Sequence, residues 1–231
     1  MTRLLASVRS IPEARQALAG GVDILDLKEP SAGALGAAPL QVTAGVVRLA
    51  AGRIPVSATI GDLPMQPRAL ARAVTACAAT GVTFVKVGCF ETRALQPCLE
   101  AIDRAPRGDA GLVAVLFADR SPSLHPLDAI AAAGFCGVML DTCDKRAGGL
   151  RAHATEEVLA AFLAEAHRLR LFAGLAGSLT VDDIPPLLAL RPDYLGFRGA
   201  LCARGARESV LDLGALAAVR EQIPRAEPAL I

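Results

Sequence analysis

The segment IPEARQALAGGVDILDLK, residues 11–28, contains the pattern that decides the fold. Residues 11–19 have the apolar spacing of a helix and end at two glycines, and residues 23–27 form a short apolar run that favours a strand. A charged residue, Lys28, follows this run at once. Helical segments, turns and buried runs in alternation are typical of a parallel sheet with crossover helices.

The same alternation recurs from one end of the chain to the other. The predicted strands are 4–8, 23–27, 56–60, 84–87, 112–117, 137–140, 171–175 and 194–197. The predicted helices are 11–19, 40–51, 67–80, 92–105, 127–133, 155–169, 181–190 and 213–222. Eight such units fit a closed α/β barrel, whereas an open flavodoxin-like sheet needs only five strands. We therefore expect a single (β/α)8 TIM-barrel domain over residues 1–231.

The bulk properties of the chain exclude several classes of protein. Its 231 residues are 53% hydrophobic, yet no apolar stretch reaches the roughly 18–20 residues of a membrane helix. The first apolar run is too short for a signal peptide, so we expect a cytoplasmic protein with no membrane partner. A formal net charge of +1, with no Trp and one Tyr, argues against nucleic acid. Because the helices are rich in Ala and barrels often associate, we expect a homo-oligomer.

The cysteines and histidines carry no metal pattern. The six cysteines form no C-x-x-C pair, and the three histidines lie far apart in the sequence. No nucleotide-binding motif is present. We therefore expect buried reduced thiols, no metal and no cofactor.

Lysine is rare in this chain, which makes each lysine informative. Of 24 basic residues only three are lysines, namely Lys28, Lys86 and Lys145. Lys28 ends the second predicted strand, Lys86 lies near the end of the fourth, and Lys145 follows the sixth. Catalytic groups of a (β/α)8 barrel lie at these carboxyl ends. Lysine, unlike arginine, can lose its proton and form an imine, although a single lysine at a strand end is more often solvated or paired with an acid.

Alternation along the strands predicts which side chains share the barrel interior. The residues expected to point inward at the ends of strands two, four, six and eight are Lys28, Lys86, Asp141 and Arg198. Asp26 lies two residues before Lys28, so it faces the same side just below. A lysine beside another cation becomes a nucleophile near neutral pH. The alternative for Asp141 is a cap on the following helix.

A phosphate site is predicted after strands seven and eight. Barrels commonly bind phosphate with backbone N–H groups of these two loops, where small residues let the anion approach and an arginine adds a charged fork. The predicted substrate-binding residues are Gly177, Ser178, Arg198, Gly199, Ser57 and Asp119. Either glycine pair could alone be a simple turn. The last two residues belong to the ends of strands three and five, where turn chemistry is the alternative.

An ordered set of motifs links the chain to one family. The motifs are AGGxDIxDxKxP at 19–30, GxLGA at 33–37, SATxGDxP at 57–64, KVG at 86–88, MLDT at 139–142 followed by Lys145, LAGS at 175–178 and RGA at 198–200. Each is weak alone, but together they resemble the (5-formylfuran-3-yl)methyl phosphate synthase family, which makes the furan ring of methanofuran and methylofuran. Residues 92–111 and 146–155 match this family poorly, so nothing is transferred there.

The resemblance implies a lyase that joins two molecules of glyceraldehyde 3-phosphate into 4-(hydroxymethyl)-2-furancarboxaldehyde phosphate, with loss of phosphate and water. It also implies that Lys28 forms the Schiff base, that Lys86 accepts a proton, and that Asp26, Asp141 and Lys145 lie in the active site. Neutral Lys28 would attack the aldehyde, and the iminium would draw electrons while Lys86 removes the neighbouring proton. The resulting enamine would attack the second triose phosphate, with an aspartate moving protons.

Two other functions remain open from the sequence. A lysine aldolase of the deoxyribose-phosphate type would use the same barrel and lysines but release an aldol, which lacks the near-ultraviolet absorbance of a furaldehyde. A regulator that binds phosphorylated sugars would bind without turnover, and arginine would then replace Lys28 without loss.

Overall fold

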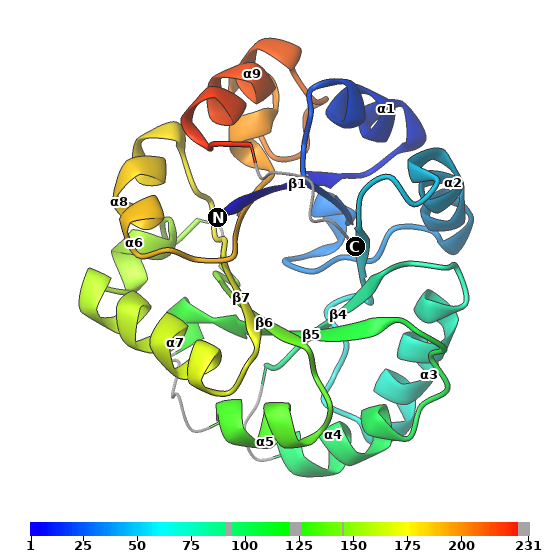
Figure 1. Ribbon diagram of the computed structural model, residues 1–231. Helices are drawn as coiled ribbons and strands as arrows, with labels where there is room; N and C mark the ends of the chain where they lie inside the picture. Colours follow the sequence, from blue (N-terminus) through cyan, green and yellow to red (C-terminus); the bar gives the residue numbers. More distant parts are fainter. Residues whose placement is uncertain (91–93, 121–125, 145, 226–231) are drawn as a thin grey trace.

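The computed structural model describes residues 1–90, 94–120, 126–144 and 146–225, and these residues confirm the predicted closed barrel. Eight parallel strands pair in sequence order, and β1 pairs with β8 to close the sheet. Helices surround the sheet on its outer side (Figure 1). The strands are β1 (Arg3–Val8), β2 (Ile24–Leu27), β3 (Val56–Thr59), β4 (Phe84–Gly88), β5 (Gly111–Phe117), β6 (Gly137–Asp141), β7 (Phe172–Leu175) and β8 (Tyr194–Phe197).

The helices lie between the strands as the alternation predicts. The α-helices of the described residues are α1 (Ile11–Ala19), α2 (Leu40–Ala50), α3 (Pro67–Ala78), α4 (Leu95–Asp103), α5 (Pro126–Ala132), α6 (Leu150–His153), α7 (Glu156–Arg168), α8 (Ile184–Ala189) and α9 (Leu213–Gln222). The 3-10 helices are η1 (Pro30–Ala32), η2 (Ala118–Arg120), η3 (Val181–Asp183), η4 (Gly199–Leu201) and η5 (Ala203–Gly205). None of the helices described is both long and apolar enough to cross a membrane.

The structure corrects two of the predicted helices and adds one. The helix predicted for 181–190 is divided into η3 and α8, because the prolines of α8 lie at its start and cannot donate the hydrogen bonds that would continue η3. The helix predicted for 92–105 begins at Leu95 in the described part of the chain. Helix α6 has only four residues, too few to produce a periodic pattern in the sequence.

The amino ends of the strands form an aromatic floor inside the barrel. Phe172 stacks on Phe84 and on Tyr194, with ring centroids 6.5 and 4.8 Å apart, and the guanidinium of Arg3 lies 5.7 Å from the Phe172 centroid. All four are the first residues of their strands. A Cβ on Gly174 would lie 2.2 Å from the Tyr194 ring, so the ring fits only because this residue is glycine. The floor fills the lower barrel, which leaves the carboxyl ends of the strands for a ligand.

Candidate active site

A pocket of about 600 Å³ opens at the carboxyl ends of the strands, within the size range of small-molecule sites. Its charged lining residues are Lys28, Lys86, Arg198, Arg207, Asp26, Asp141 and Asp182. The structure therefore brings the four residues expected to point inward, together with Asp26, to one pocket. This convergence follows from the closed sheet, since residues far apart in sequence end their strands around one opening.

Lys86 and Asp26 form an ion pair inside the barrel. The Lys86 Nζ lies 2.9 Å from the Asp26 Oδ1, and each side chain is 3% exposed. Ser57 Oγ donates to the same oxygen at 2.6 Å, while Ser7 Oγ donates to Oδ2 at 2.9 Å. Both carboxylate oxygens are thus bound in a buried cluster that fixes the carboxylate and the amine facing it.

Lys28 enters the same pocket from the residue after β2. Its backbone N–H donates to the carbonyl of Val8 at 3.1 Å, which extends the β1–β2 pairing by one residue. The residue is only 7% exposed. Since it lies two residues after Asp26, its side chain shares the interior side of the strand. A buried amine that shares a cavity with a second lysine has the surroundings expected of a nucleophilic lysine.

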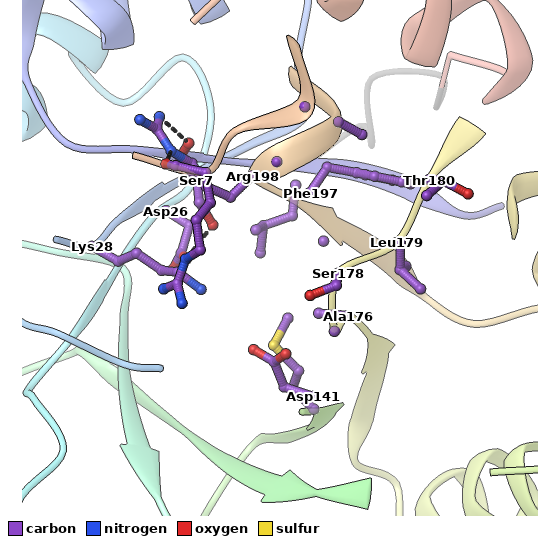
Figure 2. Close-up of a pocket in the computed structure, with 18 of the residues that line it drawn as sticks. Ser7, Asp26, Lys28, Asp141, Ala176, Ser178, Leu179, Thr180, Phe197 and Arg198 are labelled. Atoms are coloured by element: carbon purple, nitrogen blue, oxygen red, sulfur yellow. Dashed lines mark hydrogen bonds between the residues drawn. The ribbon is translucent and has the colours of Figure 1, made fainter. Parts of the chain in front are cut away.

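Asp141, the last residue of β6, lies across the pocket from Lys28 (Figure 2). Its Oδ1 accepts a hydrogen bond from the backbone N–H of Thr142 at 2.7 Å, and the residue is 2% exposed. The carboxylate therefore shapes the turn after β6 and faces the pocket. It does not cap the following helix, because α6 begins after its N-cap Gly149.

The loops after β7 and β8 supply small residues to the pocket. Gly177 and Ser178 have positive φ angles of 109° and 49°. A Cβ at Gly177 would lie 3.0 Å from the backbone nitrogen of Thr142, so a larger residue would collide with the β6 loop. Gly199 lines the pocket beside them. Successive N–H groups in such turns form concavities that bind anions, which supports the predicted phosphate site.

Arg198 lines the pocket, but its guanidinium does not offer the predicted fork to a phosphate. The guanidinium has five N–H groups, and each has a protein acceptor: Nε donates to Arg207 O (2.8 Å), Nη1 to Glu13 Oε2 (2.6 Å) and Ser7 O (3.2 Å), and Nη2 to Glu13 Oε1 (3.2 Å) and Ser209 O (2.8 Å). The expected fork is wrong because an acidic residue of α1 and three carbonyls use all of its donors. Arg198 instead joins β8 to α1 and to the loop before α9.

Ser57 and Asp119 are not among the described residues that line the pocket. Ser57 instead donates to Asp26. Asp119 accepts hydrogen bonds from the backbone N–H groups of Cys143 and Asp144, at 2.7 and 2.6 Å. Burial raises the pKa of Asp119, but these backbone hydrogen bonds outweigh burial and hold the pKa below its usual value. The prediction that Ser57 and Asp119 touch substrate is therefore corrected. Lys145, the third lysine predicted for the active site, lies outside the described residues.

Sequence reasoning missed several residues that line the pocket, and three of them contact or accompany its charged groups. Ser7, near the end of β1, shares its inward side with Leu5, a pattern that could have found it. Met139 lies two residues before Asp141 and places its Sδ 3.8 Å from the Lys86 Nζ. Arg207 lies in the long loop before α9, where no periodicity indicates which way a side chain points.

The cysteines provide no nucleophile to this pocket. Cys77, Cys98 and Cys202 are buried as predicted, whereas Cys136 is exposed, contrary to the prediction. Burial raises the pKa of the Cys77 thiol to about 12, so this cysteine remains a neutral core residue at physiological pH.

The fold and the pocket define a (β/α)8-barrel protein that holds two lysines in one pocket at the carboxyl ends of its strands. Solved structures with a similar fold include phosphoribosyl anthranilate isomerase from Thermus thermophilus, with a TM-score of 0.65 and 16% identity over 96% of this chain and 98% of that one. Another is 3-hexulose-6-phosphate synthase, with a TM-score of 0.63 and 19% identity over 96% of this chain and 100% of that one. At such identities the likeness shows the fold alone.

The family is shown by more similar sequences. Residues 4–220 match the 4-HFC-P synthase family, and the chain belongs to it. It is 42% identical, over 98% of this chain and 93% of the relative, to a Methylorubrum extorquens protein named provisionally as (5-formylfuran-3-yl)methyl phosphate synthase. It is 39% identical to the (5-formylfuran-3-yl)methyl phosphate synthase of Methanopyrus kandleri, over 89% of this chain and 91% of the relative.

Proposed function

We propose that this protein condenses two molecules of glyceraldehyde 3-phosphate into 4-(hydroxymethyl)-2-furancarboxaldehyde phosphate, through a Schiff base on Lys28. The product would supply the furan of methanofuran or methylofuran. The observation that carries the proposal is the pocket that Lys28 shares with the Lys86–Asp26 ion pair, in a chain whose named relatives are furan-phosphate synthases.

The first step is formation of the imine. The amine of Lys28 attacks the aldehyde carbon of one triose phosphate and forms a carbinolamine. The ammonium of Lys86 gives a proton to the carbinolamine hydroxyl, which leaves as water while the nitrogen lone pair forms the C=N bond. The ion pair with Asp26 supports this role, because it presents Lys86 with a proton to give.

The second step uses the same lysine in its other protonation state. Lys86, now a neutral amine, removes the proton from the carbon beside the iminium, and the electrons of that C–H bond form an enamine. The enamine carbon makes the new bond to the second triose phosphate. One phosphate and one further water are then lost, which together with the water of imine formation balances the atoms of the furan product. Lys28 is released when a substrate hydroxyl replaces its nitrogen at the iminium carbon. Asp141, across the pocket, is placed to take and return protons during these eliminations.

Backbone N–H groups of the loops after β7 and β8 contribute to phosphate binding. Gly177, Ser178 and Gly199 line the pocket. Ser178 lies apart from Lys28 across the opening (Figure 2), so a phosphate at this turn leaves the aldehyde facing the amine. Fixing the two reacting groups in this way provides the proximity on which a bimolecular condensation depends.

The decisive experiment traps the imine. The protein is mixed with glyceraldehyde 3-phosphate, reduced with borohydride and digested, and peptide masses are mapped. The proposal expects a reduced adduct on the peptide with Lys28, none on Lys28→Arg, and a near-ultraviolet absorbing product from the wild type alone. An adduct with an aldol product would identify an aldolase instead, and the absence of any adduct on that peptide refutes the covalent mechanism.

Lys86→Ala tests the second lysine. If Lys86 gives and takes the protons of the proposed steps, turnover falls by roughly two to four orders of magnitude, while some adduct on Lys28 still accumulates over long incubation. Normal turnover by Lys86→Ala would remove Lys86 from the mechanism.

A further inference from the structure

The loop between β8 and α9 places a second arginine against the pocket. This loop contains η4 and η5 and is closed by an antiparallel bridge between Cys202 and Leu211. Five of its residues line the pocket, namely Arg198, Gly199, Ala200, Gly205 and Arg207. The loop therefore forms part of the pocket wall although it belongs to neither the barrel nor the outer helices.

The guanidinium of Arg207 has few partners within the protein. Its Nη2 donates one hydrogen bond to the carbonyl of Gly33 at 2.8 Å. In the described part of the chain it makes no other hydrogen bond and no ion pair, so four of its five N–H groups have no protein acceptor. Two other basic residues of the pocket differ: Lys86 is paired with Asp26, and Arg198 with Glu13. Arg207 is half-buried, and no carboxylate of the described residues lies within ion-pair distance of its guanidinium.

We infer that Arg207 is a further substrate-binding residue, whose guanidinium binds the phosphoryl group of a triose phosphate in the pocket. This inference rests on the proposed function for the identity of the ligand. A planar guanidinium matches two phosphoryl oxygens with two parallel N–H groups, which a lysine cannot do. The bond to Gly33 uses one donor and leaves the others for the anion.

Arg198 positions Arg207 without touching the phosphate itself. Its Nε donates to the carbonyl of Arg207 at 2.8 Å and its Nη2 to that of Ser209 at 2.8 Å. The bidentate pair with Glu13 of α1 fixes the guanidinium that makes these bonds. Arg9 adds a third tie, since its Nη1 donates to the carbonyl of Glu208 at 2.9 Å. Three consecutive residues of the loop are thus anchored through their carbonyls, so the backbone that carries Arg207 is fixed before a ligand arrives.

Binding of sn-glycerol 3-phosphate, measured by titration calorimetry, tests Arg207 without chemistry at Lys28. The probe carries a phosphate but no aldehyde, so it cannot form an imine. Arg207→Gln should weaken binding roughly tenfold to hundredfold, the usual effect of losing a charge-assisted contact, with Arg207→Lys in between. Arg204→Gln is the matched control, because it removes the same charge from an exposed residue of the same loop that does not line the pocket. Unchanged binding by Arg207→Gln, or no binding by the wild type, overturns the inference.

A second pair of measurements separates this inference from the proposed function. Trapping with unphosphorylated glyceraldehyde should give the same amount of Lys28 adduct in the wild type and in Arg207→Gln, whereas trapping with glyceraldehyde 3-phosphate should favour the wild type. If the wild type forms no adduct, but Arg207→Gln still weakens the binding of sn-glycerol 3-phosphate, the Schiff base is refuted and the inference is retained. Equal losses with both aldehydes would refute the inference alone.

The positioning role of Arg198 is tested by steady-state kinetics and by adduct formation of the Arg198→Lys variant. Arg198→Lys keeps a charge but has too few N–H groups for the contacts of the arginine. It should raise KM for glyceraldehyde 3-phosphate by about tenfold and leave adduct formation with unphosphorylated glyceraldehyde unchanged. A lower kcat with unchanged KM would contradict this role. If the variant does not fold, the Arg207 variants still decide the inference.

Discussion

Replacing Ser57 with alanine separates support of Asp26 from contact with substrate. The hydroxyl donates to the Asp26 carboxylate at 2.6 Å, and the residue is 1% exposed, so its loss removes a buried charge-assisted hydrogen bond. Such bonds contribute about 1.5–3 kcal/mol, and we expect the free energy of unfolding to fall by that amount. Because Asp26 faces Lys86, kcat should fall by roughly tenfold to hundredfold as the pair loses its fixed position, while KM stays near the wild-type value.

The assay combines denaturant unfolding with steady-state kinetics on glyceraldehyde 3-phosphate. Thr59→Val is the matched control, because Thr59 lies on the same strand and its buried hydroxyl donates to the carbonyl of Gly36 at 2.9 Å rather than to a charged group. The control should lose about 0.5–1.5 kcal/mol of stability with little change in kcat. If Ser57→Ala raises KM and leaves stability untouched, Ser57 contacts substrate and the assignment is wrong.

Three further predictions concern groups outside the reacting centre. Arg198→Met should lower the free energy of unfolding, measured by denaturant titration, by about 3–5 kcal/mol, because it leaves the buried carboxylate of Glu13 without its partner. Adding Glu13→Gln should restore part of this loss. A loss below about 1 kcal/mol would contradict a buried ion pair. Asp119→Ala should cost about 1–3 kcal/mol at pH 7, since the carboxylate accepts two backbone hydrogen bonds. The pKa of Asp119 is lowered in the folded state, so its contribution is present above its usual pKa of about 3.9 and lost as the pH falls through the folded-state value. The stability gap between wild type and Asp119→Ala should therefore narrow below about pH 4, and a constant gap in acid unfolding scans would refute the assignment. Iodoacetamide at pH 8, followed by mass mapping, should modify Cys136 faster than Cys77. Burial raises the pKa of both thiols, but Cys136 is exposed, whereas Cys77 is buried and its pKa is raised to about 12. Labelling of Cys77 as fast as that of Cys136 would contradict this reasoning.

The barrel could be predicted from the sequence because its strands are buried on both faces. Strands of this kind read as short apolar runs, and each one expected here coincides with or overlaps an observed strand. Few polar residues interrupt the ends of these runs. Their positions in the sequence alone therefore predict that Lys28, Lys86 and Asp141 lie at the carboxyl ends of the strands, where the pocket opens. The position of a residue was sufficient because side chains alternate between the two faces of a strand and the sheet is closed. Few orientations therefore remain for a side chain at a strand end.

The errors arose where one polar residue serves another. Arg198 and Glu13 are 185 residues apart in the sequence, and nothing local shows that an acid from α1 will use the arginine at the end of β8. Ser57 had the same ambiguity, because a hydroxyl facing inward can contact either a ligand or a neighbouring carboxylate. Arg207 lies on an irregular loop whose course depends on its hydrogen bonds to distant residues, so no repeat in the sequence reports its direction.

Among the residues that the structure describes, the stacked rings fill the barrel interior at the amino ends of the strands, and the pocket opens at the carboxyl ends. With Phe84, Phe172 and Tyr194 at the amino ends, the described residues leave the loops at the carboxyl ends as the route for reactants and products. In such a chamber the proposed condensation of two triose phosphates would impose an order of binding: the molecule that reacts with Lys28 would have to enter before its partner blocks the opening. Crowding of the rim by excess triose phosphate would then slow product departure, and inhibition at high substrate concentration is its kinetic signature.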